Sequence, residues 1–345
     1  MEKKERKPVY YSEYLQLDKI LNAQNPESVK EGVRADDEML FIIIHQAYEL
    51  WFKQIIFELD IVRNIFKQPN IPNNSPDVYN TVHRLKRICR ILDIAVSQMS
   101  VLETMTPLDF LDFRDLLRPA SGFQSIQFKM IEAKLGLQFQ HRHGQGYYLS
   151  QLKAEDVDRV KEAETEESLL VLINRWLERM PFIKNQSYWQ ETNSDRPFWM
   201  QYRSAYDSSL QEVEKSNMKS FDQLFINDDS YPEGRSFSAD ANRNALFIML
   251  YRDHPLLHLP YELLSTLLEI DELLSLWRHR HIHLVQRTIG KRVGTGGSSG
   301  AEYLTKAADT HYVFKELAEL TSFLLPRNLL PALPDQLIKD LSYRD

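Results

Sequence analysis

The chain has 345 residues, of which 43% are hydrophobic, so it is long enough and apolar enough to bury a large core. Its formal net charge of −7 argues against nucleic acid as the main partner. The only cysteine, Cys89, excludes an internal disulfide, a cysteine-rich zinc site and an iron–sulfur cluster.

The N-terminal residues predict a tail and one short helix. No hydrophobic signal segment follows the charged first residues, and no run of about 18 apolar residues predicts a membrane span, so we expect a cytoplasmic protein. Residues 11–21 place Tyr14, Leu17 and Leu21 on one helix face, and Asn25-Pro26 end the pattern. Because so short a helix is not stable alone, we expect it to dock on its own core or on a neighbouring subunit.

A long helix follows, from a cap at Asp36 or Asp37 to about Lys67. Its first half is apolar nearly all round, which predicts a central position. It carries His45, and Phe41 lies one turn earlier on the same face. This histidine has two interpretations: a core side chain satisfied by hydrogen bonds, or a residue beside haem or beside a substrate N–H.

The next helices have clear start signals. Ser75-Pro76 begins a helix to about Met105, in which Cys89 belongs to the apolar stripe and is expected to pack in the core. Thr106 to Asp109 form a capping box before a helix that carries Phe110 and Arg114. Arg114 is either a surface side chain paired with a neighbouring aspartate or a clamp on a substrate carboxylate. Residues 124–135 predict another helix, ended by Gly136.

Residues 140–240 are more polar, and we interpret them as a smaller helical elaboration. It is predicted to contain helices at 166–180 and 197–225 and an exposed loop at 226–240. Helices are then predicted at 242–252, from Pro260 to about Gly290, and at 301–325. No strand alternation and no internal repeat are evident, so the prediction is one all-α domain over residues 1–345, a large helical bundle with that elaboration.

Three histidines cluster near the end of the helix that starts at Pro260. His281 projects from the most apolar stripe of this helix, with Trp277 one turn earlier. It is either a core histidine or an axial ligand of haem, which would be non-covalent because no CxxCH motif is present. His279 and His283 lie on another face and are expected to be solvated, since no third metal ligand accompanies them.

A glycine-rich loop, GTGGSSG at residues 294–300, follows this helix. It follows no strand and ends without Gly-Lys-Ser/Thr, which argues against a phosphate loop. It is either a flexible linker or a mobile loop whose Thr295 hydroxyl binds an anion or an amino-acid backbone. Taken alone, these patterns predict a helical protein and leave haem binding open.

Five segments together resemble tryptophan 2,3-dioxygenase, the haem enzyme family that opens the indole ring of L-tryptophan. They are YSEYLQLDKIL, DEMLFIIIHQAYELWFKQIIFELD, LDFRDLLRPASGFQSIQF, LWRHRHIHLVQRTIG and GTGGSSG. They occur in the family's order and span nearly the whole chain, with the weakest correspondence at 137–240. The resemblance implies non-covalent haem b and a dioxygenase that inserts both atoms of O2 into the indole C2–C3 bond. The product would be N-formyl-L-kynurenine, in the first step of the kynurenine pathway.

The resemblance also implies a role for particular residues. For the cofactor, it implies that His281 binds the iron, beside Trp277, Ser121 and Gly122. For L-tryptophan, it implies that His45 is the catalytic histidine that accepts the indole N–H. The other implied substrate contacts are Phe41, Phe110, Arg114 and Thr295. Some family members have a tyrosine at Phe110, whose hydroxyl also touches the carboxylate; Arg114 would pair with that carboxylate and Thr295 with the amino-acid backbone. The family is a homotetramer in which Tyr11, Tyr14 and Leu15 would enter a neighbouring subunit's site.

Three competing functions remain open from sequence. One is a haem-dependent monooxygenase of a modified indole, another is a non-catalytic helical haem or ligand sensor, and the third is a haem-free helical interaction protein. Counting the oxygen atoms in the product separates the first from a dioxygenase. Tryptophan-dependent O2 consumption and haem absorption test the other two.

Overall fold

The computed structural model describes residues 8–69, 75–137, 152–189, 197–290, 292, 304–305, 308 and 311–342. Within these residues the ordered elements are helices, and no strand occurs, so the all-α prediction is confirmed. No helix in the described ranges is long and apolar enough to cross a membrane. The division of residues 1–345 into one domain with an elaboration stays a prediction.

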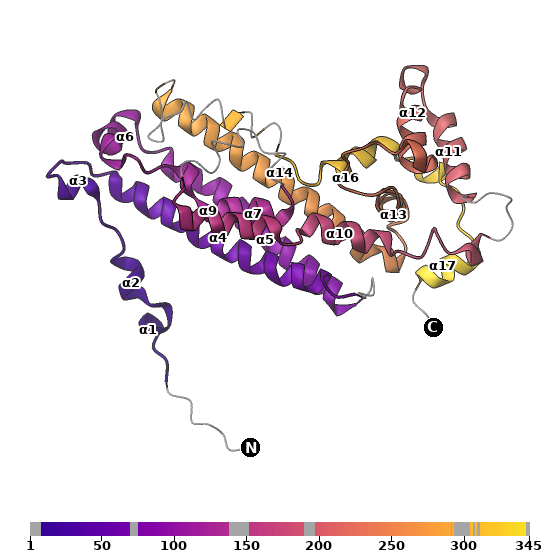
Figure 1. Cartoon of the computed structure of the whole chain (residues 1–345), viewed down its shortest axis with the longest axis horizontal. Coiled ribbons are helices and arrows are strands. Elements are labelled where there is room, and N and C mark those ends of the chain that lie inside the picture. The colour runs from indigo at the N-terminus through magenta and orange to yellow at the C-terminus, as the bar shows by residue number, and fades with distance from the viewer. Residues whose placement is uncertain are drawn as a thin grey trace, which may run out of the picture.

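Three long helices lie side by side and form the centre of the molecule (Figure 1). They are α4 (Glu38–Phe66), α5 (Pro76–Leu102) and α14 (Pro255–Ile289). α5 packs against both α4 and α14, while α7 (Ile126–Leu135) covers another side of α4. Ile55, Leu59, Leu85 and Leu267 are fully buried between them, and each such side chain contributes about 1.5–3 kcal/mol by leaving water.

Several helix ends were correctly predicted from local sequence. The Ser75 side chain accepts a hydrogen bond from the backbone N–H of Val78 at the start of α5. Thr106 and Asp109 form the capping box of α6 (Pro107–Arg114), as predicted. Gly136 ends α7 with φ 135°, and a Cβ there would lie 2.6 Å from the Cβ of Leu170, so both its conformation and its surroundings require glycine.

Three predicted helices differ in the structure. The first is broken at Gln16, which has φ 52°, into α1 (Tyr11–Leu15) and α2 (Leu17–Leu21). α14 begins at Pro255 instead of Pro260, because the proline at its first position needs no N–H partner, and the chain continues helically through Pro260. The helix expected over 197–225 is divided into α11 (Pro197–Ser209), α12 (Asn217–Phe221) and the wider-wound turn η6 (Asp222–Ile226).

Two further predictions were wrong because of contacts distant in sequence. The loop at 226–240 is not wholly exposed, since Phe237 is buried. Of the last long helix expected at 301–325, residues 311–314 are not helical; Asp271 accepts the backbone N–H groups of Val313 and Phe314 there. The helix resumes as α16 (Lys315–Glu319) and η8 (Leu320–Phe323).

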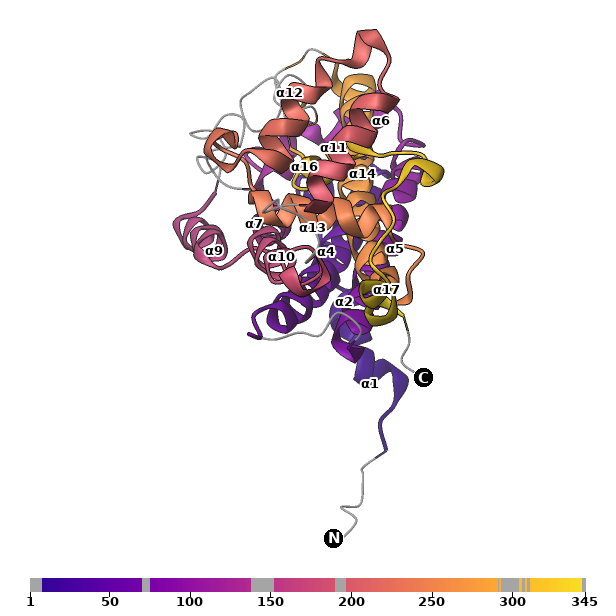
Figure 2. The same ribbon diagram turned by 90° about the vertical axis from the view of Figure 1, so that its right-hand side faces the viewer.

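Many of the remaining helices lie toward one end of the long helices, the end that faces the viewer in Figure 2, whereas α3 and α6 lie at the other end (Figure 1). α9 (Ala154–Thr165) packs on α7, and α10 (Leu169–Glu178) packs on α13 (Ala239–Leu250) and on α4. The other elements are α3 (Glu27–Lys30), α17 (Asp335–Leu341) and the single turns η1 (Asp115–Leu117), η2 (Gly122–Gln124), η4 (Gln186–Tyr188), η5 (Glu212–Glu214), η7 (Asp228–Ser230) and η9 (Arg327–Leu329).

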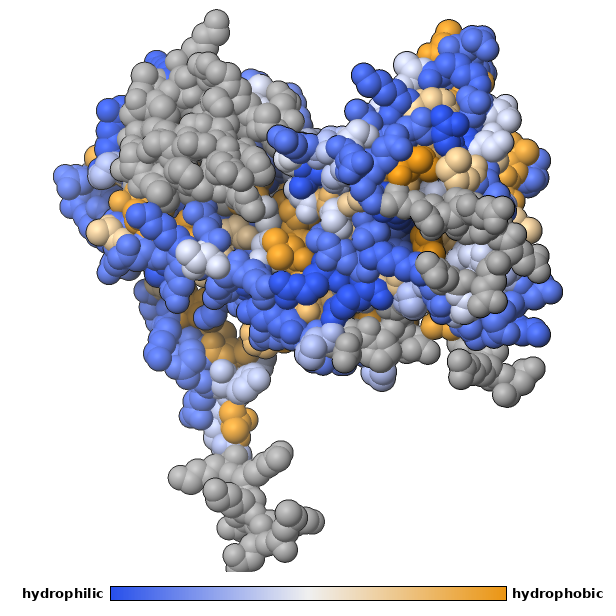
Figure 3. All heavy atoms as spheres, turned by 45° about the vertical axis from the view of Figure 1, so that its right-hand side comes forward, coloured by the Kyte–Doolittle hydropathy of each residue, from blue (hydrophilic) through white to orange (hydrophobic). Residues whose placement is uncertain are grey.

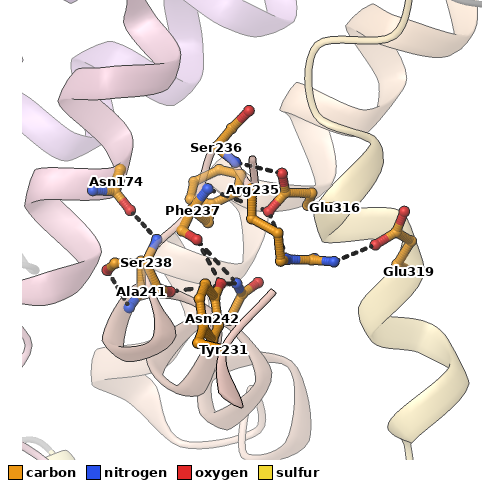
Figure 4. A network of polar contacts seen from close by, with 10 residues as sticks. All are labelled: Asn174, Tyr231, Arg235, Ser236, Phe237, Ser238, Ala241, Asn242, Glu316 and Glu319. Atoms are coloured by element: carbon orange, nitrogen blue, oxygen red, sulfur yellow. Dashed lines mark hydrogen bonds and ion pairs between the residues drawn. The ribbon is translucent and has the colours of Figure 1, made fainter. Parts of the chain in front are cut away.

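A buried polar network joins α10, α13 and α16 at this end (Figure 4). The Glu316 carboxylate accepts the backbone N–H groups of Ser236 and Phe237, at 2.6 and 3.2 Å. Ser238 caps α13, and its own backbone N–H donates to the Asn174 side chain on α10. Because these donors are backbone groups of the segment 236–238, the network fixes this segment and is a structural feature of the elaboration.

The N-terminal helices α1 and α2 project from the body and bury no residue of their own (Figure 3). Tyr11 and Tyr14 are each 75% exposed. Contiguous exposed aromatic side chains of this size are costly in water, so the segment is suited to docking on another surface.

Candidate active site

Two histidines from two of the central helices lie at the centre of the candidate site. On α4, the Nδ1 atom of His45 lies 2.7 Å from the backbone oxygen of Phe41. A carbonyl can only accept, so Nδ1 carries the proton and the neutral ring presents Nε2 as an acceptor. Burial lowers the pKa of His45, which keeps the ring neutral near pH 7. The helix therefore holds the tautomer that can accept a hydrogen bond from a ligand.

On α14, His281 is also neutral. Burial, together with repulsion from His45, lowers its pKa to about 4. Its Nδ1 atom is buried and has no hydrogen-bond partner among the described residues. The two histidines stand 236 positions apart in the sequence, and a positive charge on His45 would disfavour one on His281.

Aromatic side chains line the region between these rings. Phe41 lies 4.1 Å from the His45 ring, measured between centroids, and Trp277 lies 5.2 Å from the His281 ring. Tyr48 joins the two groups, at 6.4 Å from His45 and 6.3 Å from Trp277. The Nε1 atom of Trp277 is buried without a hydrogen-bond partner in the described part of the chain. A planar aromatic ligand would find apolar faces and polar edges here.

The α6 helix adds aromatic rings and a positive charge. Phe110 and Phe113 lie 5.7 and 5.6 Å from Phe41. Arg114 follows in the last turn of α6 and is only 5% exposed. Arg114 therefore does not lie on the surface, which was one of the positions considered from sequence. A buried guanidinium close to an aromatic region is the arrangement that recognises the carboxylate of an aromatic amino acid.

Ser121 and Gly122 lie in the turn that leads from α6 to α7. The Ser121 hydroxyl accepts the backbone N–H of Phe123, and Gln124 closes a capping box with it. At the end of this turn, the Ser125 hydroxyl donates to Glu49 of α4 at 2.6 Å. The turn is thus attached to α4 one helical turn beyond His45.

The other two clustered histidines occupy a polar environment. The Nδ1 atom of His279 donates to the backbone oxygen of Ser275 at 2.8 Å, while His283 is exposed. No cluster of three or more His, Cys, Asp or Glu side chains in the described residues could hold a metal ion. These positions agree with the interpretation of His279 and His283 as a polar face.

Not every predicted site residue is brought to this region. Tyr11, Tyr14 and Leu15 lie on α1, away from α6 and α14 in the same chain (Figure 1). Thr295 and the glycine loop lie outside the described residues.

The structure also adds Tyr48, Glu49 and Phe128, none of which was assigned to the site from the sequence. Tyr48 and Glu49 stand three and four positions after His45, which is the spacing that could have identified them.

The polar atoms of His281, Trp277 and His45 are of the kind that a haem site requires. The ring of His281 is neutral, as an iron ligand must be, and it lies on an apolar helix face. Two buried polar atoms, Nδ1 of His281 and Nε1 of Trp277, have no hydrogen-bond partner among the described residues. Unpaired buried atoms of this kind are expected where a bound ligand with polar edges supplies the partner. Across the region, His45 offers one acceptor to a second ligand.

Comparison with known proteins identifies a single family. A family profile described as tryptophan 2,3-dioxygenase matches residues 1–324. A protein of that name from Dictyostelium discoideum is 44% identical over 95% of this chain and 87% of its own length. Its namesake from Alteromonas mediterranea is 40% identical over 99% of both chains. The one from Xenopus laevis is 41% identical over 96% of this chain and 86% of its own. The likeness covers every segment that carries a candidate site residue.

Proposed function

The chain belongs to the tryptophan 2,3-dioxygenase family, and from this premise we propose that haem b and L-tryptophan bind between α4 and α14. The protein is an oxidoreductase, a dioxygenase that oxidises tryptophan, and its family depends on haem. The single observation that carries the placement is the pair of neutral histidines, His45 and His281, which are linked by the ring contacts of Tyr48 with His45 and with Trp277, the neighbour of His281.

In this proposal the cofactor is held mainly from α14. His281 ligates the iron and Trp277 packs beside it, while Ser121 and Gly122 border the cofactor from the turn before α7. Haem, when bound, supplies the activation of O2. The chain's own contribution is to orient the substrate and to exclude water from the reacting atoms.

The substrate is oriented from α4 and α6. The Nε2 atom of His45 accepts the indole N–H, because Nδ1 is already committed to the Phe41 carbonyl. Phe41 packs on the indole, Phe110 borders it, and Arg114 pairs with the carboxylate. Thr295 contacts the amino-acid backbone. An indole that lacks the carboxylate is then bound less well, because it cannot form this charge-assisted contact.

A set of three histidine variants tests the proposed iron ligand. His281→Ala should abolish haem retention, whereas His279→Ala and His283→Ala should retain haem, because only His281 stands on the apolar face. Haem content is measured from the Soret absorption of each purified protein. The opposite pattern, with haem lost in the His279 or His283 variant alone, would overturn the assignment.

The product distinguishes the reaction from its nearest alternative. With labelled O2, both oxygen atoms should enter N-formyl-L-kynurenine. One labelled atom would indicate a monooxygenase instead. Absence of tryptophan-dependent O2 consumption by reduced, haem-loaded protein would favour a sensor.

We also propose that the enzyme is a homotetramer. Support comes from α1 and α2, whose aromatic side chains are exposed in the single chain. Tyr11, Tyr14 and Leu15 would then complete the site of a neighbouring subunit. A cytoplasmic location stays a prediction from the sequence.

A further inference from the structure

An acidic residue one helical turn after the catalytic histidine accepts three hydrogen bonds that the proposed mechanism does not use, two on its carboxylate and one on its backbone oxygen. Glu49 lies one turn after His45 on α4. Its Oε1 atom accepts the Ser125 hydroxyl at 2.6 Å, and its Oε2 atom accepts the Gln127 side-chain N–H at 2.8 Å. The same Gln127 nitrogen donates to the backbone oxygen of Glu49 at 2.7 Å. One residue of α4 thus holds two side chains at the start of α7.

These contacts also fix the start of α7 itself. The Ser125 hydroxyl that donates to Glu49 accepts the backbone N–H of Phe128 at 3.3 Å, which makes Ser125 the N-cap of α7. Hydrogen bonds to a charged group are stronger than neutral ones, so the Glu49 carboxylate is well suited to fix this cap.

The fixed segment includes residues proposed to border the cofactor and a ring that packs beside the proposed iron ligand's neighbour. Before Ser125, the turn contains Ser121 and Gly122. After Ser125, Phe128 packs on Trp277 with ring centroids 4.7 Å apart, and Trp277 lies beside His281. Glu49 therefore lies on the element that carries His45 and holds the segment that packs against the neighbour of His281.

Glu49 also acts on His45 through its charge. Burial is the main influence on His45 and lowers its pKa, whereas the Phe41 hydrogen bond and the Glu49 charge raise it. Removal of the Glu49 charge should therefore lower the pKa of His45 further. This effect accompanies the hydrogen bonds and can be measured separately from them.

We propose that Glu49 is a positioning residue for tryptophan oxidation, which holds the turn at residues 121–125 against α4 through Ser125 and Gln127. It contacts neither substrate nor cofactor. It keeps the residues that border the cofactor at a fixed position relative to His45. The inference rests on the proposed placement of haem between α4 and α14.

Two substitutions separate the hydrogen bonds from the charge. In Glu49→Gln, the amide oxygen can still accept from Gln127, and the amide NH2 can donate to the Ser125 oxygen, so the turn stays attached. In Glu49→Ala, both side-chain contacts are lost, and only the hydrogen bond from Gln127 to the backbone oxygen remains. Ser125→Ala removes one contact from the other side and leaves the Glu49 charge in place. Glu58→Gln is the matched control, since Glu58 is a buried carboxylate on α4 that pairs with Arg84 and Arg87 and does not contact the turn.

Haem retention and turnover are measured first. The rate of haem loss to an excess of apomyoglobin should rise about tenfold in Glu49→Ala and Ser125→Ala, and stay near the wild-type rate in Glu49→Gln and Glu58→Gln. With activity expressed per bound haem, KM for tryptophan in Glu49→Ala should rise by a larger factor than the factor by which kcat falls. Lower thermal stability of Glu49→Ala with unchanged haem loss and unchanged KM would overturn the proposal and leave Glu49 a helix-to-helix contact.

Haem-free protein provides a readout that does not depend on the cofactor. Hydrogen exchange of the Phe128 amide should accelerate in Glu49→Ala and Ser125→Ala, but not in Glu49→Gln. The pKa of His45, followed by NMR, should fall in Glu49→Gln and Glu49→Ala alone. If neither the wild type nor any variant binds haem, the proposed function fails. The amide exchange of Phe128 and the pKa of His45 still decide whether Glu49 fixes the turn. Unchanged exchange in Glu49→Ala would refute the positioning role directly.

Discussion

At the scale of single residues, one hydrogen bond decides what His45 can do. Its Nδ1 donates to the carbonyl of Phe41 in the same helix, so Nε2 is left as the acceptor. Burial lowers the pKa of this ring. Because the protonated ring has no acceptor, the substrate contact should fail only at a pH below the ordinary histidine range.

Arg114 is the residue whose removal should most affect substrate recognition. Arg114→Ala should lower kcat/KM for L-tryptophan by roughly 2–4 kcal/mol, because one partner of a buried charge pair is removed. Steady-state kinetics measure this loss, and tryptamine, which lacks the carboxylate, is the matched substrate on which the variant should show little loss. An unchanged kcat/KM for L-tryptophan would remove the proposed role of Arg114.

At the scale of elements, one strip of α14 holds the chain segment that precedes α16. Asp271 accepts the N–H groups of Val313 and Phe314, and Ser275 shares a hydrogen bond of 2.7 Å with the Tyr312 hydroxyl. Arg278 donates to the His311 carbonyl at 2.9 Å and to Glu132 of α7 at 2.7 Å. Positions 271, 275 and 278 share one helix face, and the segment 311–314 runs along it in a non-helical conformation.

Asp271 should make the stability of this contact depend on pH. Burial raises its pKa to about 6, against the opposing effects of the two backbone N–H groups and of Arg278. The folded state therefore binds this proton more tightly than the unfolded state does. The resulting stabilisation is fully present below about pH 4 and is lost as the pH rises through 6.

Asp271→Asn removes this titration and so tests it. Between about pH 4 and pH 6.5, the unfolding free energy of the wild type minus that of the variant should decrease by about 2 kcal/mol as the pH rises. Urea unfolding at a series of pH values measures the difference, and Asp93→Asn, at an exposed aspartate of α5, is the control that should show almost none. A difference independent of pH would contradict the raised pKa.

At the scale of the whole molecule, the outer face of α4 suggests where a second copy binds. Met39, Ile43, Leu50 and Phe57 are exposed at spacings of four and seven residues, which places them along one side of the helix. Leu50 is 55% and Phe57 58% exposed. Such a row of apolar side chains is typical of a helix that packs on a partner.

The pair of substitutions Leu50→Glu and Phe57→Glu should therefore dissociate the proposed tetramer, because charges would be buried in the interface. Light scattering with size-exclusion chromatography measures the mass in solution. Val213→Glu changes a residue that is 85% exposed in the elaboration and should leave the mass unchanged. A tetramer that persists in the double variant would place the interface elsewhere.

The sequence by itself determined the features that depend on neighbouring residues. The cap at Ser75, the capping box at Thr106 and the apolar face of His281 follow from spacings within one or two helical turns, which the chain encodes locally. The all-α class follows from the same periodicity. The recognition of the family needed the order of several such segments along the chain.

Tertiary structure decided what distant residues do to one another. The segment 311–314 leaves the expected helix because Asp271, more than 40 residues earlier, takes its N–H groups. Glu49 accepts hydrogen bonds from Ser125 and Gln127 only because the fold brings these residues next to it from 76 and 78 positions away in the sequence. No local spacing encodes such pairings, since they arise when packed helices bring buried polar groups together and each group must find a partner.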